Sequence, residues 1–399
     1  MNRSVLRSLA ASAGLSLLVA LIAGEAVVRR LGSFDEDGTF VLHGHRIRPY
    51  LPPIHSVERT LRAYLSEPRG YMAFDADLGW TNRPEAQSQD GLYRTNSAGL
   101  RANRDFAPEA PPGVLRIAIF GDSFVHGHDV PLAGSLAPQL EELLGRNGIP
   151  AETLNFGVGG YGIDQAYLRY RREGPRLHPA IVLLGLQVEN IERSVNVVRA
   201  FYFHDTGIPF TKPRFVLDGK DLRAVNSPTV PLDQIPELLE HFSRSPLGRF
   251  EFFYRAADYE WLLYRRSRLL ASVVDVVRDR FGGSSGGSRL LAPGSDATKV
   301  TLAIAERFRS EAEANGSRFL LVYLPIRPAI EALAAGRRDP YAPLVDLFRA
   351  RFRLIDPSDL FSAEARLRPV ESLVPSHYTP GGNRLVAEAI ARQMPPAAR

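Results

Sequence analysis

The chain opens with a strongly apolar stretch. Ser8 to Val28 reads SLAASAGLSLLVALIAGEAVV, 21 residues with one carboxylate near the far end. About 20 apolar residues suffice to cross the hydrocarbon core of a bilayer. Arg3 and Arg7 precede the stretch, and positive flanks tend to stay cytoplasmic. Residues 1–30 therefore predict a single-pass membrane anchor that leaves the rest of the chain outside the cytoplasm.

Two other interpretations of this segment stay open. A cleavable signal peptide is one, because Gly24 and Ala26 are small enough for a cleavage site that ends at Ala26. The protein would then be secreted. A buried core helix is the other, although the extreme terminus is an awkward place for one. Arg29 and Arg30 weaken the orientation argument, since they put equal charge on the other side.

From Leu115 onward, short apolar runs alternate with segments of helical spacing. The predicted strands are Arg116–Phe120, Ala151–Val158, Pro179–Gln187, Ser317–Pro325 and Phe352–Asp356. The predicted helices are Pro131–Gly148, Gly162–Gly174, Ala297–Asn315, Tyr341–Arg351 and Pro380–Met394. Strands that are apolar on both faces and alternate with helices indicate a parallel sheet covered on both sides. We expect an α/β fold, a three-layer α/β/α sandwich with a five-stranded parallel sheet in flavodoxin-like order.

Two segments do not follow this alternation. Residues 31–112 are polar and contain prolines, and we interpret them as an irregular N-terminal extension that packs on the following domain. Residues 193–296 are rich in aromatic side chains and end in GGSSGGS, Gly282–Ser288, whose composition is that of a flexible linker. This second segment is too long for a crossover loop. The domain at 113–399 is therefore expected to carry a large insertion.

Composition and charge exclude several classes of protein. The 399 residues include no cysteine, which removes disulfide scaffolds, thiolate metal sites and cysteine nucleophiles. Four arginines against Glu25 give the first thirty residues a charge of +3, which leaves +2 of the total +5 for the other 369. No basic run or basic stripe with interleaved aromatics is present, so we expect no nucleic-acid partner.

The strongest chemical signal is IFGDSFVHG, Ile119–Gly127. It lies where an apolar strand ends and a loop leads to a helix, which is where open parallel sheets build their sites. Ser123 would present its hydroxyl there, and a serine hydroxyl becomes a good nucleophile once a base takes its proton. Gly-Asp-Ser alone is also compatible with an ordinary strand-ending turn.

Three later segments end at the same predicted edge of the sheet. NFGVGGYG, Asn155–Gly162, is dense in glycine, and GLQVEN, Gly185–Asn190, delivers the Asn190 amide. Backbone N–H groups and an amide are suited to stabilising an oxyanion. His377 lies in the loop before the last helix, where a neutral imidazole could serve as the base for Ser123.

The order and spacing of these four blocks resemble the SGNH (GDSL) hydrolase family. The matching positions are Ser123 in Gly-Asp-Ser, then Asn155, Gly157 and Gly160 in the second block, Asn190 in the third and His377 in the last. The anchored N-terminus and the insertion look like the membrane-tethered bacterial branch. Its relatives include periplasmic enzymes that move acetyl groups on polysaccharides.

The resemblance implies a role for each of these residues. Ser123 would be the nucleophile and His377 the general base. The backbone N–H groups of Ser123 and Gly160 would form the oxyanion hole with the Asn190 side chain. Asp122 would be structural. We expect no metal and no cofactor.

The chain departs from the family pattern in two places. The third block usually reads Gly-x-Asn-Asp, whereas Asn190 lies five residues after Gly185 and precedes Ile191. The triad aspartate usually stands three residues before the histidine, and this chain has Val374 there. The third triad member is therefore unknown from the sequence. A backbone carbonyl near Val374 and a carboxylate from elsewhere, such as Glu371, Asp356 or Asp359, are the alternatives.

For two further groups of residues the sequence supports only weaker predictions. His126, His128 and Asp129 are close enough in sequence to suggest a metal site, but their place beside Ser123 favours a pocket wall or solvent contact. Tyr161 and Gln165 either line a substrate pocket or pack locally against a helix.

The predicted activity is ester chemistry outside the bacterial cytoplasmic membrane, in the periplasm. We expect an esterase that removes an acyl group, with acetyl favoured, from a small molecule or polysaccharide through an acyl-enzyme on Ser123. A polysaccharide O-acyltransferase with the same Ser-His site is the first alternative. A non-catalytic binding protein on this fold is the second, prompted by the missing aspartate and the long insertion.

Overall fold

A computed structural model describes residues 3–204, 207–219, 221–281 and 289–394. The linker expected at Gly282–Ser288 lies outside these residues. The core is one parallel sheet in the order β12-β11-β8-β6-β7. Its strands are β6 (Leu115–Phe120), β7 (Ala151–Asn155), β8 (Ile181–Leu186), β11 (Arg318–Tyr323) and β12 (Leu354–Ile355). The predicted α/β fold with five parallel strands in flavodoxin-like order is confirmed.

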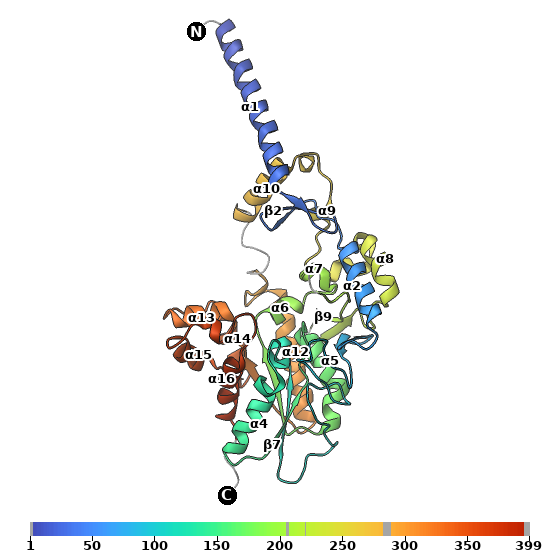
Figure 1. The fold of residues 1–399 in the computed structure, drawn as a ribbon, viewed down its shortest axis with the longest axis vertical. Helices are drawn as coiled ribbons and strands as arrows, with labels where there is room; N and C mark the ends of the chain where they lie inside the picture. Colours follow the sequence, from blue (N-terminus) through green and yellow to red (C-terminus); the bar gives the residue numbers. More distant parts are fainter. Residues whose placement is uncertain (1–2, 205–206, 220, 282–288, 395–399) are drawn as a thin grey trace.

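Side-chain alternation along the strands separates two apolar cores, one on each face of the sheet. In β6, Ile117 and Ile119 enter one core while Ala118 and Phe120 enter the other, because successive residues of a strand point to opposite faces. One core is covered by α4 (Leu136–Arg146), α13 (Arg327–Ala334), α15 (Ser358–Ala365) and α16 (Pro380–Ala391). The other is covered by α5 (Ile163–Glu173), α12 (Asp296–Ala314) and α14 (Ala342–Arg349). The three layers are visible in Figure 1.

The N-terminal extension contains short regular elements that the sequence did not predict. They are β1 (Ser33–Phe34), β2 (Phe40–Leu42), β3 (His45–Ile47), α2 (Ile54–Ser66), β4 (Met72–Asp75) and β5 (Gly79–Asn82). The β4–β5 hairpin is bound to the loop after β7: Trp80 Nε1 donates to the Gly159 carbonyl and Asn82 Nδ2 to the Gly157 carbonyl. The extension thus supports a glycine-rich loop at the edge of the sheet.

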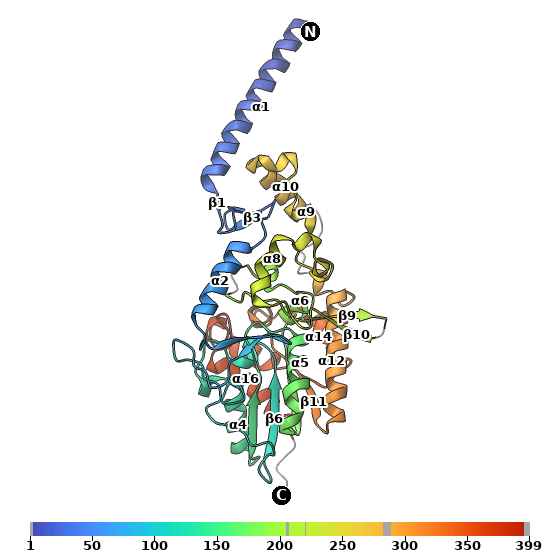
Figure 2. The ribbon, with the colours of Figure 1, turned by 90° about the vertical axis from the view of Figure 1, so that its right-hand side faces the viewer.

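The segment at 193–296 packs against this extension. Its elements are α7 (Arg199–Tyr202), β9 (Arg214–Asp218), β10 (Asp221–Val225), α8 (Ile235–Glu240), α9 (Ala256–Tyr259) and α10 (Arg268–Phe281), and α6 (Glu189–Arg193) leads into it. Val57 of α2 packs in one cluster with Ile235 and Leu239 of α8. Arg48 of the extension pairs with both Asp258 and Asp275. The two segments outside the alternating pattern therefore form one body at one end of the sheet (Figure 2).

The first helix contacts the rest of the protein only near its C-terminal end, where Glu25 accepts hydrogen bonds from Ser267, Arg268 and Leu269, among the described residues. α1 (Arg3–Leu31) projects away from the molecule, as Figures 1 and 2 both show. Its part Ala11–Leu31 is long and apolar enough to cross a membrane and is not buried against the rest of the protein.

Candidate active site

Ser123 is placed by the turn that ends β6. It is the first residue of the short helix α3 (Ser123–His126), and the Asp122 carboxylate caps this helix by accepting from Phe124 N. A Cβ on Gly121 would lie 2.5 Å from a methyl of Val125, so only glycine lets the chain turn this tightly into the helix. The result is a nearly buried serine at the carboxyl edge of the sheet, the edge at which β6, β7 and β8 end.

His377 lies beside Ser123 in the structure, although the two residues are 254 positions apart in the sequence. Its Nε2 lies 3.0 Å from Ser123 Oγ. The loop is fixed on both sides of the ring: buried Tyr378 donates its hydroxyl to the Pro325 carbonyl, and Thr379 caps α16 by accepting from Gly382 N. The two residues singled out as nucleophile and base are therefore within hydrogen-bond reach of each other.

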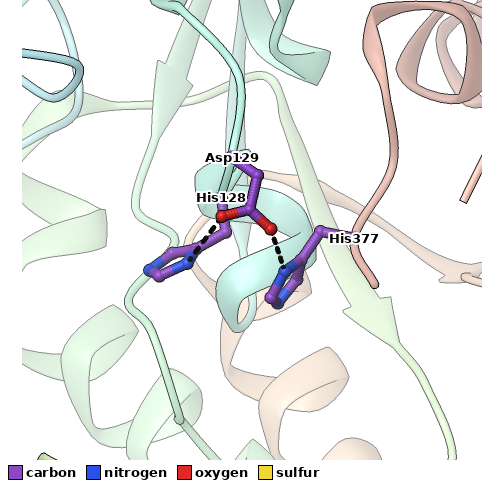
Figure 3. Close-up of side chains that lie close together, drawn as sticks. All are labelled: His128, Asp129 and His377. Atoms are coloured by element: carbon purple, nitrogen blue, oxygen red, sulfur yellow. Dashed lines mark hydrogen bonds and ion pairs between the residues drawn. The ribbon is translucent and has the colours of Figure 1, made fainter. Parts of the chain in front are cut away.

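Asp129 is the carboxylate that contacts the other side of this imidazole. Its Oδ2 lies 2.8 Å from His377 Nδ1 and also accepts from Ser376 Oγ at 3.1 Å. Figure 3 shows Asp129 between the rings of His377 and His128. Partial burial would raise the pKa of Asp129, but the hydrogen bonds from His377 and Ser376 and the nearby imidazole charge hold it below its usual value. The group is a carboxylate at neutral pH.

Two of the carboxylates considered from the sequence pair with other residues. Glu371 pairs with Arg327, and Asp356 pairs with Arg349. The sequence pattern did not single out Asp129 for this contact, because the triad aspartate is expected close to the histidine in sequence and Asp129 is 248 residues away. The available signal was its place six residues after Ser123, in the loop that leaves α3.

The two histidines near Ser123 differ in their surroundings. His126 is buried, with its Nε2 2.8 Å from the Tyr71 hydroxyl. Burial, followed by the nearby Arg101 charge, sets its pKa well below the usual value, so this ring is neutral. His128 is partly exposed, with its Nδ1 3.9 Å from Asp129 Oδ1 and its ring 5.0 Å from that of His377. His128, and not His126, borders the site.

Two groups among the described residues bring potential metal-ligating atoms within 4.8 Å of one another. One is His128, Asp129 and His377, and the other is Asp35, Asp37 and His204. In the first group His377 Nδ1 already bonds to Asp129, and in the second Asp37 accepts hydrogen bonds from Ser56.

The loop after β7 lies directly against α3. Asn155 Nδ2 donates to the Val125 carbonyl, while its Oδ1 accepts from Gly157 N. A Cβ on Gly157 would lie 2.2 Å from the backbone nitrogen of His126, so glycine allows the close contact. Gly160 adopts a left-handed φ of +78°, and a Cβ there would face Ile208, Trp80 and Arg199.

Asp122 is held by three cationic or amide side chains. Arg193 Nη1 donates to its Oδ2 at 2.8 Å, Gln187 Nε2 at 2.8 Å and Asn190 Nδ2 at 3.0 Å. Asn190 also donates to the Tyr161 carbonyl. Asp122 therefore orients the turn before Ser123, with its charge compensated by Arg193.

Gln187 and Arg193 of this cluster were not singled out from the sequence. Gln187 lies two residues after Gly185, the position at which Gly-x-Asn-Asp has its asparagine. That spacing was the available signal.

Tyr161 and Gln165, considered as pocket-lining residues, are buried. Tyr161 donates its hydroxyl to the Trp80 carbonyl at 2.7 Å, and Gln165 Nε2 donates to the Leu78 carbonyl at 2.7 Å. Both side chains tie α5 and the loop before it to the β4–β5 hairpin. Their role in this structure is the local contact.

Comparison with known proteins finds similar solved structures. No family model matches the chain, and no curated protein matches it. An acetyl xylan esterase structure is 14% identical, with a TM-score of 0.38, and the match covers 70% of this chain and all of that one. A putative lipolytic protein of the G-D-S-L family from Desulfitobacterium hafniense is 12% identical, with a TM-score of 0.33 and coverage of 70% and 99%. A catalytic mutant of an acetylxylan esterase from Geobacillus stearothermophilus is 10% identical, with a TM-score of 0.37 and coverage of 70% and 93%. At these identities and TM-scores, the activities of those proteins are not transferred to this chain.

Proposed function

We propose that the protein is a membrane-anchored serine esterase that removes an acyl group, proposed to be acetyl, from an ester on a carbohydrate. The observation that carries this proposal is the chain of hydrogen bonds from Ser123 Oγ through His377 to Asp129. A nucleophile, a base and a group that orients the base are the parts that acyl transfer through serine requires. The carbohydrate and the acetyl group rest on the resemblance of the anchored N-terminus and the insertion to the membrane-tethered bacterial branch.

In the proposed reaction Ser123 Oγ attacks the ester carbonyl carbon while His377 Nε2 takes its proton. The Asp129 carboxylate accepts from Nδ1–H, which keeps the imidazole in the correct tautomer and stabilises its protonated form. The tetrahedral intermediate collapses, and the alcohol leaves with the proton from His377. Water then attacks the acyl-enzyme with His377 as base, releasing the acid and regenerating Ser123.

We propose the backbone N–H groups of Ser123 and Gly160 as the direct donors to the oxyanion. Asn190, the third group assigned to this role from the sequence, donates to Asp122 and to the Tyr161 carbonyl. It therefore serves the oxyanion hole by holding the turn before Ser123 and the Gly160–Tyr161 segment in place.

We propose that α1 anchors the protein in the cytoplasmic membrane with the catalytic domain on the periplasmic side. The alternative is a signal peptide cleaved after Ala26. Glu25 accepts hydrogen bonds from Ser267 Oγ, Arg268 N and Leu269 N. Cleavage after Ala26 would remove Glu25 and leave this end of α10 without its cap, which favours retention of α1.

Labelling with a serine-reactive fluorophosphonate tests the proposal. The wild-type protein should be labelled and Ser123→Ala should not, with Ser372→Ala as a control, because Ser372 is a surface serine that donates to the Pro369 carbonyl. A wild-type protein as unreactive as Ser123→Ala would leave the non-catalytic binding protein as the function. Partitioning of the acyl group between water and an added glycan then separates esterase from O-acyltransferase.

A further inference from the structure

The helix α10 has its apolar residues on the outside. Its buried face is formed by Arg268, Ala271, Ser272 and Asp275, which are polar or small. Five large apolar side chains instead face solvent: Leu270, Val273, Val274, Val276 and Val277. A helix on the surface of a water-soluble domain normally has the opposite arrangement. The outward face of α10 is therefore suited to an apolar environment.

Three more exposed apolar residues precede this helix. Trp261, Leu262 and Leu263 are 60%, 41% and 80% exposed. The Arg268 guanidinium lies over the Trp261 ring, 5.8 Å from its centroid, so Trp261 sits beside the start of α10. We call these three residues and the five on α10 the apolar patch. Exposed apolar side chains gathered on neighbouring segments indicate a site of contact with protein or membrane.

The apolar patch is fixed to the end of the candidate membrane span. Glu25 of α1 caps α10, and Leu269 packs on Gly24, where a Cβ would lie 2.9 Å from its Cδ2. Arg29 Nη2 also donates to the Arg266 carbonyl. Figures 1 and 2 both show α10 beside the lower end of α1.

This position gives α10 a depth relative to a bilayer. If Ser8–Val28 crosses the hydrocarbon core, Gly24 and Glu25 lie about one helical turn, roughly 5 Å, inside its outer boundary. Amphipathic helices that lie in the plane of a membrane bury their apolar face about 5–10 Å into the boundary between headgroups and acyl chains. The contact with Gly24 therefore places α10 at the depth such helices occupy.

We propose that the apolar patch inserts into the outer leaflet of the same membrane that α1 spans, as a second attachment point. The occupant is lipid, because the patch is continuous with the span and because tryptophan favours the membrane interface. Exposed arginines on α1, on α10 and in the segment just before α10 suit anionic headgroups: Arg29, Arg30, Arg266, Arg278 and Arg280. This proposal rests on the proposed anchor.

The second attachment fixes the orientation of the catalytic domain. A single transmembrane helix can tilt in the bilayer and would carry the domain with it, whereas a second contact with the membrane limits that tilt. α10 is tied to the extension through Arg48, whose guanidinium pairs with Asp275 and Asp258 and whose N–H donates to Asp275. The extension in turn carries the β4–β5 hairpin that supports the loop at the active site.

The absence of cysteine from the chain makes a direct test available. Single-cysteine variants of the full chain, Val273→Cys and Val277→Cys, are labelled with a nitroxide in vesicles of phosphatidylcholine and phosphatidylglycerol. Leu15→Cys in α1 reports on the anchor, and Leu367→Cys, 82% exposed on the catalytic domain, reports on water. Collision with oxygen and with a water-soluble nickel chelate gives the depth of each probe. We expect positions 273 and 277 to be accessible to oxygen, like position 15, and position 367 to the nickel chelate.

Each other outcome has a distinct meaning. Probes at 273 and 277 that collide with the nickel chelate, while position 15 stays in lipid, would overturn the second attachment and leave the anchor intact. All four probes in water would show that the anchor itself is wrong. Efficient cross-linking of position 273 between two copies would assign the patch to self-association instead. Val273→Asp combined with Val277→Asp should move a probe at Val276→Cys from lipid to water while activity on a soluble ester stays unchanged.

Discussion

At the scale of single residues, Asp129 is the carboxylate that contacts the His377 imidazole. It adopts a left-handed φ of +66°, which an aspartate tolerates better than most residues. The carboxylate then faces His377 from the loop that follows the nucleophile. The proposed nucleophile and the proposed orienting group thus lie six residues apart, Ser123 in α3 and Asp129 in the loop that follows it.

Asp129→Asn should lower kcat by roughly 10²–10⁴-fold with little change in KM, because an amide donates to His377 in the wrong direction and does not stabilise its protonated form. Steady-state kinetics on a soluble aryl ester measure this. Ser376→Ala is the matched control: it removes one hydrogen bond to the same oxygen but leaves the carboxylate in contact with His377, so a loss of about tenfold or less is expected. An unchanged kcat in Asp129→Asn would exclude Asp129 from the proposed mechanism.

His126 should make stability depend on pH. Burial holds its pKa well below the ordinary 6.5, so below that pH the unfolded chain binds a proton that the folded protein does not. The free energy of unfolding should therefore fall as pH falls through 6.5, by up to about 1.4 kcal/mol per pH unit for this group. Urea unfolding from pH 7.5 to 5.5 measures the slope, and His126→Gln should be flatter than wild type. Parallel slopes in the two proteins would contradict this assignment.

At the scale of elements, the N-terminal extension holds the loop that follows α3 in the candidate active site. The Arg101 guanidinium donates to the carbonyls of His126, Gly127 and Val130, and the Tyr93 hydroxyl accepts from Asp129 N at 2.9 Å. Both side chains belong to the N-terminal extension. The extension therefore positions the loop that carries Asp129.

Tyr93→Phe should lower kcat by about 2–10-fold and leave KM unchanged, since it removes one hydrogen bond worth about 0.5–1.5 kcal/mol from the Asp129 loop. The effect of Tyr93→Phe should disappear in the Asp129→Asn background, because the effects of substitutions that act through the same group are not additive. Kinetics of the double-mutant cycle check this. Equal losses in both backgrounds would mean that Tyr93 acts elsewhere.

Gly157→Ala tests the contact between the loop after β7 and α3. The added Cβ would meet main-chain atoms of His126 and Val125, which cannot rotate away, so a loss of about 1–3 kcal/mol and reduced activity are expected. Gly145→Ala in α4 is the control, since nothing lies within 4 Å of its Cβ position. That control should be neutral or more stable by up to about 1 kcal/mol. Thermal unfolding measures both, and equal behaviour of the two variants would argue against the contact.

At the scale of the whole molecule, the extension and the insertion lie between α1 and the sheet (Figures 1 and 2). They connect the candidate membrane span to the loops of the active site through packed and hydrogen-bonded contacts. If α1 spans a membrane as proposed, these contacts hold the candidate active site at a fixed position relative to the membrane surface.

The proposed orientation across the membrane rests on Arg3 and Arg7, which precede the apolar stretch. With the catalytic domain in the periplasm, Leu367→Cys should react with a membrane-impermeant maleimide in cells whose outer membrane alone has been permeabilised. A cysteine in place of Arg7 should react only after the inner membrane is opened. Gel-shift assays read out both, and the reverse pattern would place the catalytic domain in the cytoplasm.

The sequence by itself determined the layers of the fold and the order of the strands. Side-chain periodicity is a local property: Ala118 and Phe120 alternate with Ile117 and Ile119, and this alternation specifies a strand buried on both faces. The ends of parallel strands share one edge, so the order of the blocks also predicted that Ser123 and His377 would come close together.

Only the tertiary structure decided which carboxylate contacts His377 and what faces outward on α10. Asp129 and His377 are 248 residues apart, and their contact depends on the direction in which two loops leave the sheet, which no local pattern encodes. The sequence of the insertion does not indicate which face of α10 is covered. Packing of its polar face on Arg48 and its end on Glu25 leaves the valines outside.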